Sequence, residues 1–220
     1  MTNLSFGLIA DVQFAFAPDR TSPGKPRFYQ NSKTLLGEAV AHWNNGKKSS
    51  FVVQLGDVID SLNANLNKSR LALDAVLEEF DKSDVEVVHV LGNHELYNFN
   101  REEQLMKTPL CICHKKRTKA KQNGQIVQDF RSATPVFYFT FTVKDSPWFR
   151  FVVLDTFEES VLGRNKASQE YKHAMNVLRK HNNNEDLSVD VGLEGIDRRY
   201  VIHNGGIGFT KVMEIRFNIY

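Results

Sequence analysis

The sequence predicts a single α/β domain, because short apolar runs alternate with longer amphipathic segments along the chain. In the first half, the runs of strand length are rich in aliphatic and β-branched residues: Leu4–Ala10, Phe51–Leu55 and Val85–Leu91. Between these runs, residues 32–43 and 69–80 have apolar side chains at helical spacing. This order is typical of a layered domain in which helices pack on a sheet.

Each predicted helix of the first half has one apolar face. The first face comprises Leu35, Leu36, Ala39, Val40 and Trp43, and the second Leu73, Val76, Leu77 and Phe80. The second half predicts further strands at 136–142, 149–154 and 212–220, a helix at 168–180 and a polar loop at 181–195. Phe137, Phe139 and Phe141 share one face of the strand at 136–142, so we expect them in the core.

Composition narrows the class of protein. A chain of 220 residues with 41% hydrophobic and 25% charged residues is sized for one soluble domain, spanning residues 1–220. A formal charge of +2 does not indicate a nucleic-acid or membrane partner, and no apolar run approaches the roughly 18 residues of a membrane helix. No basic flank precedes the short first apolar run, and two cysteines make no disulfide framework. We therefore expect a cytoplasmic monomer.

Three segments rich in polar side chains follow the three apolar runs of the first half. They are Asp11-Val12-Gln13, Gly56-Asp57-Val58-Ile59-Asp60 and Gly92-Asn93-His94-Glu95. Because ligands bind at the carboxyl ends of strands in α/β sheets, we expect these segments to converge in space. Each alone has an ordinary interpretation, such as a turn followed by a capped helix. Their occurrence in this order, each at a strand end, favours a shared site.

The side chains of these segments suit hard divalent cations. Asp11 and Asp57 offer carboxylates, and Gln13 and Asn93 offer amide oxygens, a set that suits Mn²⁺ or Mg²⁺ better than structural zinc. Two such ions about 3.5–4 Å apart can clamp both oxygens of an in-line displacement at phosphorus. We expect Asp57 to bridge the ions, and His94 to face the phosphate and to stabilise charge or protonate the leaving oxygen. Glu95 either orients His94 or caps the next segment.

These motifs resemble the first-half signature of the calcineurin-like metallophosphoesterase superfamily, D-x-[H/Q], G-D-x-x-D and G-N-H-[D/E]. Within it, the sequence is most similar to the manganese-dependent ADP-ribose/CDP-alcohol diphosphatases, which have glutamine in the first motif, as at Gln13. Further matches lie at Arg27-Phe28-Tyr29 with Ser32, at Trp43-Asn44-Asn45, and at Leu154-Asp155 with Val161-Leu162-Gly163. The similarity runs from about Leu4 to Gly208.

The resemblance implies a β-sandwich flanked by helices, in αββα layers. It also implies Mn²⁺-dependent hydrolysis of the diphosphate linkage in ADP-ribose and CDP-choline by a metal-activated water, with Mg²⁺ as the alternative ion. The metal ligands would be Asp11, Gln13, Asp57 and Asn93, with His94 as the catalytic residue at the phosphate. The partners would be small nucleoside diphosphate derivatives.

The sequence departs from the family pattern near its end. The family continues with a strand ending in histidine and with a Gly-His-x-His loop, whereas none of the seven histidines here is followed by another two positions later. Residues 209–220 diverge from the pattern, so we expect a domain that is incomplete at its C-terminus. Two other hypotheses stay open: a catalytically impaired or dead fragment that acts as a binding module, and a phosphoesterase for monoesters or diesters.

Three lesser features have alternative interpretations. Cys111-Ile112-Cys113-His114 could be a zinc clip, although the spacing is not the usual one. The basic residues of 115–121 could contact nucleic acid or form a solvated loop, and the absence of interleaved aromatic residues favours the loop. Near the first motif, four residues could contact a base or ribose: Phe14, Phe16, Arg27 and Phe28.

Overall fold

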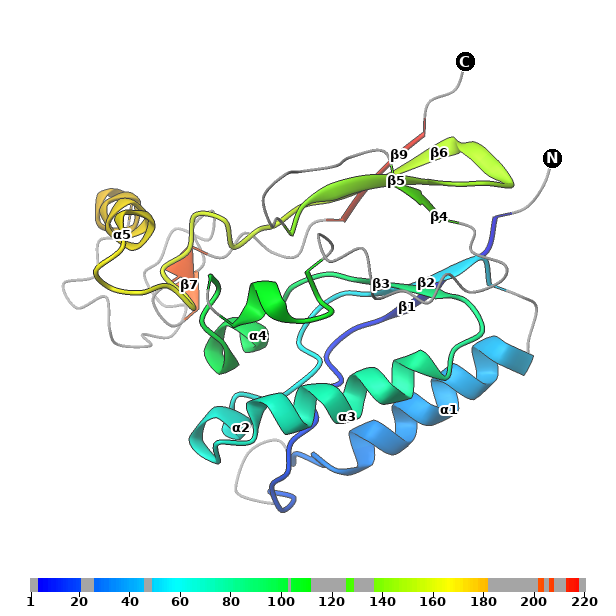
Figure 1. Ribbon diagram of the computed structural model, residues 1–220, viewed down its shortest axis with the longest axis horizontal. Helices are drawn as coiled ribbons and strands as arrows, with labels where there is room; N and C mark the ends of the chain where they lie inside the picture. The colour runs from blue at the N-terminus through cyan, green and yellow to red at the C-terminus, as the bar shows by residue number, and fades with distance from the viewer. Residues whose placement is uncertain are drawn as a thin grey trace.

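Two sheets form the centre of the protein (Figure 1). The computed structural model describes residues 4–20, 26–45, 49–102, 104–111, 126–128, 137–181, 202–203, 206–207 and 213–217. The first sheet is parallel, in the order β1 (Gly7–Ile9), β2 (Phe51–Gln54), β3 (Glu86–His89). Val52 pairs with Gly7 on one side and with Val87 on the other, so the three strands end together at one edge.

The second sheet is antiparallel. Its strands are β4 (Ile126–Gln128), β5 (Phe139–Val143), β6 (Ser146–Val153) and β9 (Met213–Phe217), in that order. A separate two-stranded ladder joins β7 (Ile202–His203) and β8 (Gly206–Ile207). The predicted strands at 136–142, 149–154 and 212–220 are thereby confirmed, whereas β4 lies in a stretch for which the sequence predicted no strand.

An aromatic core joins the two sheets. Phe51 of β2 contacts Phe141 and Phe151 of the second sheet at ring-centroid distances of 5.4 and 5.0 Å, both edge to face. Val53 and Val88 from the first sheet, and Phe139 and Val153 from the second, complete this cluster. The phenylalanine face predicted at 137, 139 and 141 is buried, as expected. Apolar burial between two sheets therefore fixes the sandwich.

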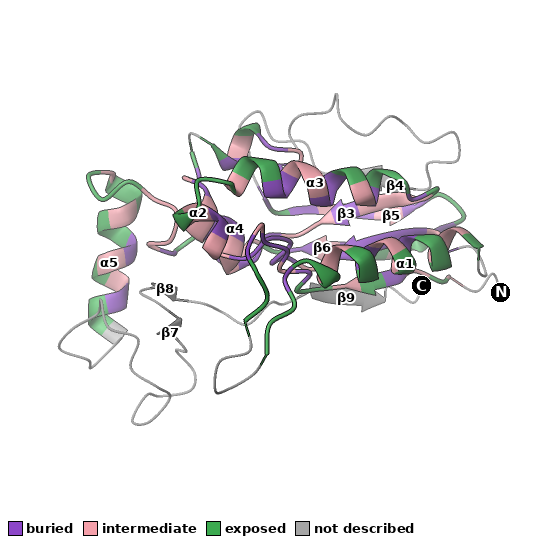
Figure 2. Cartoon of the chain, turned by 90° about the horizontal axis from the view of Figure 1, so that it is seen from below, coloured by how far each residue is buried: buried purple, intermediate pink, exposed green. Residues whose placement is uncertain are grey.

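Helices α1 (Asn31–Asn45) and α3 (Ser69–Asp81) cover the other face of the parallel sheet, as Figure 1 shows. In Figure 2, buried purple segments lie between pink and green ones along α3. The buried residues are Leu36 and Val40 in α1 and Ala72, Leu73, Val76, Leu77 and Phe80 in α3. The prediction for Leu35 is wrong: it is 55% exposed, because the buried face of α1 is centred on Leu36 and Val40.

The remaining helical elements are α2 (Leu62–Asn65), α4 (Asn93–Asn98), the 3-10 turn η1 (Leu105–Lys107) and α5 (Gln169–His181). The helix predicted at 168–180 is α5, in which Ala174 and Leu178 are buried. The sequence predicted neither α2 nor α4, because helices of four and six residues are too short to show a periodic apolar face.

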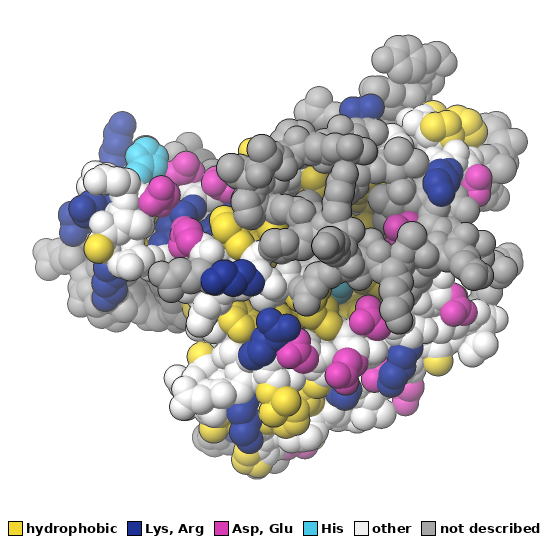
Figure 3. All heavy atoms as spheres, viewed as in Figure 1, with side chains coloured by type: hydrophobic (Ala, Val, Ile, Leu, Met, Phe, Trp, Pro, Cys, Tyr) yellow, Lys and Arg dark blue, Asp and Glu magenta, His cyan; other side chains and the backbone are white. Residues whose placement is uncertain are grey.

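The described residues provide the helix, sheet and sheet layers of the predicted α/β sandwich. The described residues include no layer of helices on the outer face of the second sheet. No helix in the described ranges is long and apolar enough to cross a membrane. On the face seen in Figure 3, acidic and basic side chains are mixed over the described surface. An anion at that part of the surface would therefore be held by local groups rather than by a broad basic field.

Truncating Phe51 tests the sandwich core. Phe51→Ala should lower the free energy of unfolding by about 3–5 kcal/mol, because it removes a fully buried ring that packs against both sheets. The measurement is urea denaturation followed by circular dichroism. Phe28→Ala is the matched control, since Phe28 is 56% exposed and its loss should change stability by no more than about 0.5 kcal/mol. Equal losses in the two variants would contradict the packing described above.

Candidate metal centre

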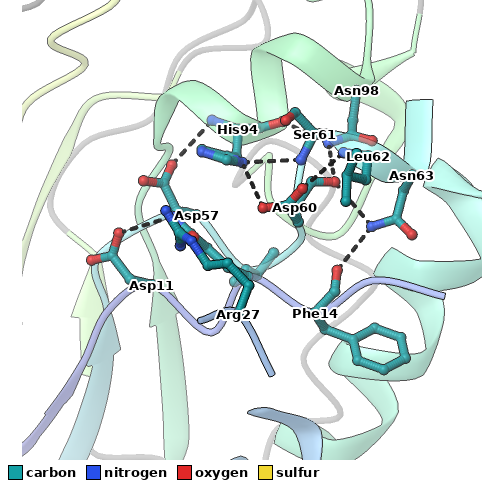
Figure 4. Close-up of polar contacts among 12 residues, drawn as sticks. Asp11, Phe14, Arg27, Asp57, Asp60, Ser61, Leu62, Asn63, His94 and Asn98 are labelled. Atoms are coloured by element: carbon teal, nitrogen blue, oxygen red, sulfur yellow. Dashed lines mark hydrogen bonds and ion pairs between the residues drawn. The ribbon is translucent and has the colours of Figure 1, made fainter. Parts of the chain in front are cut away.

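The first two motif loops are joined by backbone hydrogen bonds that continue the ladder between β1 and β2. The amide of Leu55 donates to Ile9 O at 2.8 Å, that of Asp11 to Gly56 O at 3.2 Å and that of Gln13 to Asp57 O at 2.9 Å. The pairing then passes through the Phe14–Ile59 bridge. Asp11 and Asp57 therefore lie on neighbouring loops whose relative position is fixed by the sheet (Figure 4).

Backbone strain is concentrated in these two loops. Four described non-glycine residues have positive φ, and three of them are predicted ligands: Asp11 (56°), Gln13 (45°) and Asp57 (59°). An L-residue in the left-handed region costs roughly 1–2 kcal/mol. Such strain persists only where the surrounding structure imposes it, and it is typical of functional sites. The strained backbone thus supports the ligand assignment independently of side-chain chemistry.

The third loop packs directly on the second through two glycines. A Cβ on Gly56 would lie 2.4 Å from Gly92 N, and one on Gly92 would lie 1.9 Å from Oδ1 of Asp57. Gly56 also has φ of +95°, in the region that favours glycine. No side chain fits at either position, so the two glycines allow the second and third loops to approach.

Glu95 binds both of these loops from α4. Its Oε2 accepts hydrogen bonds from the amides of Asp57 (2.9 Å) and Gly92 (2.8 Å), and its Oε1 accepts one from Val58 (2.8 Å). The side chain is fully buried, and burial together with the charge of Asp57 raises the pKa of the Glu95 carboxyl to about 7. Of the two roles considered for Glu95, the structure supports capping: it caps α4 at Gly92 and also anchors the second loop.

His94 lies against the second loop. Its backbone amide donates to Asp57 Oδ1 at 3.1 Å, and its ring Nδ1 accepts a hydrogen bond from the Ser61 amide at 3.0 Å. Asp60 Oδ2 is 4.0 Å from the same ring nitrogen. Because Nδ1 is the acceptor, the neutral ring carries its hydrogen on Nε2. The ring is thereby oriented with one N–H available for chemistry.

Two carboxamides that the sequence analysis did not identify fasten the loops. Asn63, fully buried, donates from Nδ2 to Phe14 O (2.8 Å) and Asp60 O (3.0 Å) and accepts from the Phe16 amide (3.1 Å). Asn98 donates from Nδ2 to Asp60 O (3.1 Å) and His94 O (2.8 Å). Asn63 thus joins the first loop to the second, and Asn98 joins the second to the third. Only their position in the fold reveals these roles, because isolated asparagines carry no sequence signal.

The Gln13 side chain forms a polar row with Asp11 and Arg27. Gln13 Nε2 donates to Asp11 Oδ1 at 3.4 Å, and Gln13 Oε1 accepts from Arg27 Nη1 at 2.5 Å. Asp11 and Arg27 are both exposed, so this side of the loops faces solvent. Among the residues suggested for base or ribose contact, Phe14 is buried in the core and Phe16 packs against it, which leaves Arg27 and Phe28 exposed.

The structure brings the predicted site residues together. Hydrogen bonds or loop contacts link Asp11, Gln13, Asp57 and His94, and Asn93 begins α4 directly after Gly92, where its side chain is half-buried. Among the described residues, no group of three His, Cys, Asp or Glu side chains surrounds a possible metal position. The candidate donor set instead combines two carboxylates with two amide oxygens, which fits hard divalent cations.

Asp155, another acid at the end of a strand, has a different role. It forms a buried ion pair with Arg101, which follows α4 and also reaches Glu158 at 3.2 Å. The amide of Arg101 donates to Gly163 O at 2.7 Å. This network ties the segment after β6 to the segment after α4. Asp155 therefore supports the architecture around the loops.

Other candidate features fall outside the centre or outside the described residues. Cys111 is buried, whereas residues 112–114 and the basic run 115–121 lie outside the described ranges. His173, on α5, pairs with Glu159 at 3.1 Å, and both side chains are exposed. Within the described residues, the metal-competent side chains thus gather at the ends of β1, β2 and β3.

Sequence comparison defines the class to which this fold and donor set correspond. Residues 4–215 match the calcineurin-like phosphoesterase family, so the chain belongs to that family. The resemblance found in the sequence is confirmed.

Individual relatives narrow the comparison. The chain is 37% identical over 211 residues to the manganese-dependent ADP-ribose/CDP-alcohol diphosphatase of Xenopus laevis, covering 94% of this chain and 58% of the relative. It is also 37% identical to the Homo sapiens protein of that name, covering 92% and 57%. The crystal structure of a dimetal phosphatase from Danio rerio matches with a TM-score of 0.70 and 36% identity, covering 94% of this chain and 61% of the other. The chain thus spans less than two thirds of the length of these proteins.

Replacing Glu95 tests its role as an anchor. Glu95→Gln should lower the free energy of unfolding by about 1–3 kcal/mol at pH 8, because one of the three amides would face a side-chain N–H instead of an acceptor. Thermal or urea denaturation measures this change. Glu78→Gln, on the exposed side of α3, is the matched control and should differ from the parent by less than about 0.5 kcal/mol. A Glu95→Gln midpoint equal to that of the control would show that the three bonds do not stabilise the fold.

Relieving the strain at Gln13 should separate stability from ion binding. Gln13→Gly should raise stability by about 1 kcal/mol, because glycine adopts positive φ without penalty. The same variant should bind Mn²⁺ at least about tenfold more weakly, since it removes one oxygen of the donor set and the contact with Arg27. Differential scanning calorimetry and titration of free Mn²⁺ by electron paramagnetic resonance measure the two effects.

Asn67→Gly is the control for this experiment, because Asn67 has φ of 54° and lies outside the centre. It should leave Mn²⁺ binding unchanged. A Gln13→Gly protein that is less stable than the parent, or one that binds Mn²⁺ equally well, would contradict the interpretation of Gln13 as a strained ligand.

Proposed function

We propose that this protein hydrolyses the diphosphate linkage of nucleoside diphosphate derivatives such as ADP-ribose and CDP-alcohols, with two Mn²⁺ ions as cofactors. The observation that carries the proposal is the convergence of three strand-end loops in which Asp11, Gln13 and Asp57 have strained backbones. The names of the relatives, which describe manganese-dependent diphosphatases, support the substrate class and the metal.

Asp11, Gln13, Asp57 and Asn93 would hold the metal ions, and Asp57, the most buried of the four, is the candidate for the ligand shared by both. A pair of divalent cations supplies a water of lowered pKa and neutralises charge on the phosphate oxygens. The residues of this chain contribute rigid placement. The ladder between the first two loops and the Glu95 anchor between the second and third fix the donor atoms before any ligand binds, which lowers the cost of ordering them.

His94 provides the charge-stabilising group. The Ser61 amide occupies Nδ1, so the neutral ring presents Nε2–H as its donor. This N–H can donate a hydrogen bond to a phosphate oxygen that gains charge. Protonation of the departing oxygen would require an imidazolium ring, which the hydrogen bond from the Ser61 amide to Nδ1 opposes. The contact between the His94 amide and Asp57 Oδ1 keeps the ring next to the metal-binding loop.

Turnover of ADP-ribose and CDP-choline with added Mn²⁺ tests the proposal. Asp57→Asn keeps the size and backbone preference of the residue but removes the charge, and should abolish both turnover and tight Mn²⁺ binding. His94→Ala should lower kcat by about 10²–10⁴ while Mn²⁺ binding persists, because the ring acts on the phosphate and not on the ions.

Asp74→Ala serves as the control, since Asp74 is an acid on α3 that pairs with Arg70 across one helical turn. It should keep the rate of the parent. Absence of turnover by the parent chain, or equal rates for the parent and the Asp57 and His94 variants, would reject the proposed activity. Faster hydrolysis of a simple phosphomonoester than of either diphosphate would reject the substrate class.

A further inference from the structure

Arg20 and Arg27 face each other in an isolated antiparallel bridge beside the first motif loop. The Arg20 amide donates to Arg27 O at 3.0 Å, and the Arg27 amide donates to Arg20 O at 2.9 Å. In such a doubly hydrogen-bonded pair the two residues lie directly opposite, with their side chains on the same face. The two arginine side chains thus project side by side from a hydrogen-bonded backbone pair.

This pair is tied to the metal centre through Gln13. Arg27 Nη1 donates to Gln13 Oε1 at 2.5 Å, and Gln13 Nε2 contacts Asp11 Oδ1. Figure 4 shows the Arg27 side chain extending toward Asp11 and Asp57. The segment after the pair is also anchored, because Tyr29 is buried with Ala15 and Ala17. Arg27 is therefore held at the rim of the loop rather than ranging freely over the surface.

The two arginines form no direct ion pair with an acid in the described part of the chain. Among the described residues, neither guanidinium forms an ion pair with a carboxylate, and both side chains are exposed. Like charges placed directly opposite on a ladder are unfavourable unless another group compensates them. Arginine is the residue best suited to bind phosphate through paired N–H groups. Two adjacent guanidinium groups of this kind suit a phosphate group.

We propose that Arg20 and Arg27 form a clamp for the phosphate of the diphosphate substrate that is not attacked. The clamp rests on the proposed function, because it assumes that the other phosphate lies at Asp11, Gln13 and Asp57. The two phosphates of a diphosphate share one bridging oxygen, so a clamp next to the metal-binding loop reaches the second phosphate of a substrate whose first is bound there. The clamp would favour diphosphate-linked substrates over monoesters, which have no second phosphate.

Binding of inorganic pyrophosphate in EDTA tests the clamp without metal. Isothermal titration calorimetry should show saturable binding to the parent chain. The double variant Arg20→Gln/Arg27→Gln should bind at least about tenfold more weakly, because two charge-assisted contacts are lost. Arg70→Gln makes the same change on the exposed surface of α3 and should bind like the parent. Absence of binding to the parent, or an equal loss in Arg70→Gln, would overturn the clamp.

A second titration, with Mn²⁺ present, separates selectivity from general charge effects. AMP and the non-hydrolysable α,β-methylene ADP are compared as monophosphate and diphosphate ligands. The double variant should lose affinity for the diphosphate analogue at least about tenfold more than for AMP. Equal losses for the two ligands would show a general electrostatic effect and would overturn the clamp.

The two titrations also distinguish this proposal from the proposed function. If pyrophosphate binds in EDTA through the arginines but the chain shows no Mn²⁺-dependent binding or turnover, the arginine pair is a phosphate-binding site, and the proposed activity fails together with the role of the pair in it. If Mn²⁺-dependent turnover of ADP-ribose occurs but the double variant keeps the ligand preference of the parent, the activity stands and the clamp fails.

Discussion

The centre depends most on the Glu95 carboxylate, which accepts hydrogen bonds from three backbone amides. Those amides belong to Asp57, Val58 and Gly92, which come from two loops separated by more than thirty positions in the sequence. A buried carboxylate is costly unless it is hydrogen-bonded, and here every bond goes to a loop of the centre. The three hydrogen bonds that offset the cost of burying Glu95 are thus the same bonds that hold the second and third loops together.

The first loop is positioned by a different principle. Its backbone continues the hydrogen bonding of the parallel sheet beyond the ends of β1 and β2, although Asp11, Gln13 and Asp57 have left-handed backbone conformations. Residues with left-handed backbones cost free energy, and they persist only where the surrounding structure holds them. The Asn63 carboxamide adds three further bonds, two to the first segment and one to Asp60 in the second. Local strain is therefore balanced by neighbouring contacts of high quality.

Much of the fold could be predicted from the sequence, because long elements carry periodic patterns. The runs at Phe51–Leu55 and Val85–Leu91 contain β2 and β3, and the apolar spacing of 69–80 matches α3. The exposure of Leu35 could not be predicted, since it lies next to Leu36 on the apolar face of α1 and only packing decides which part of that face is buried. Short elements such as α2 and α4 have too few residues for any period.

The candidate centre shows the same division. Asp11, Gln13, Asp57 and His94 were predicted because each lies in a motif that ends a strand, and the structure brings their loops together. The roles of Asn63, Asn98 and Glu95 are visible only in three dimensions. These side chains bond to backbone atoms, which every residue type has, so no pairing of residue types announces the contact in the sequence. The role of Asp155 is also a matter of geometry, because an acid at a strand end can meet either a cation or an arginine.

The contact between Gly92 and Asp57 has a consequence for reading natural variation in this protein. Any side chain at position 92 would first meet Oδ1 of Asp57, the carboxylate proposed to bridge the ions, before it met any hydrophobic group. A variant at this glycine would therefore displace a ligand even if the fold survived. A measurement of stability alone would miss part of its effect, because a variant would disturb the proposed coordination of the ions as well as the packing of the two loops.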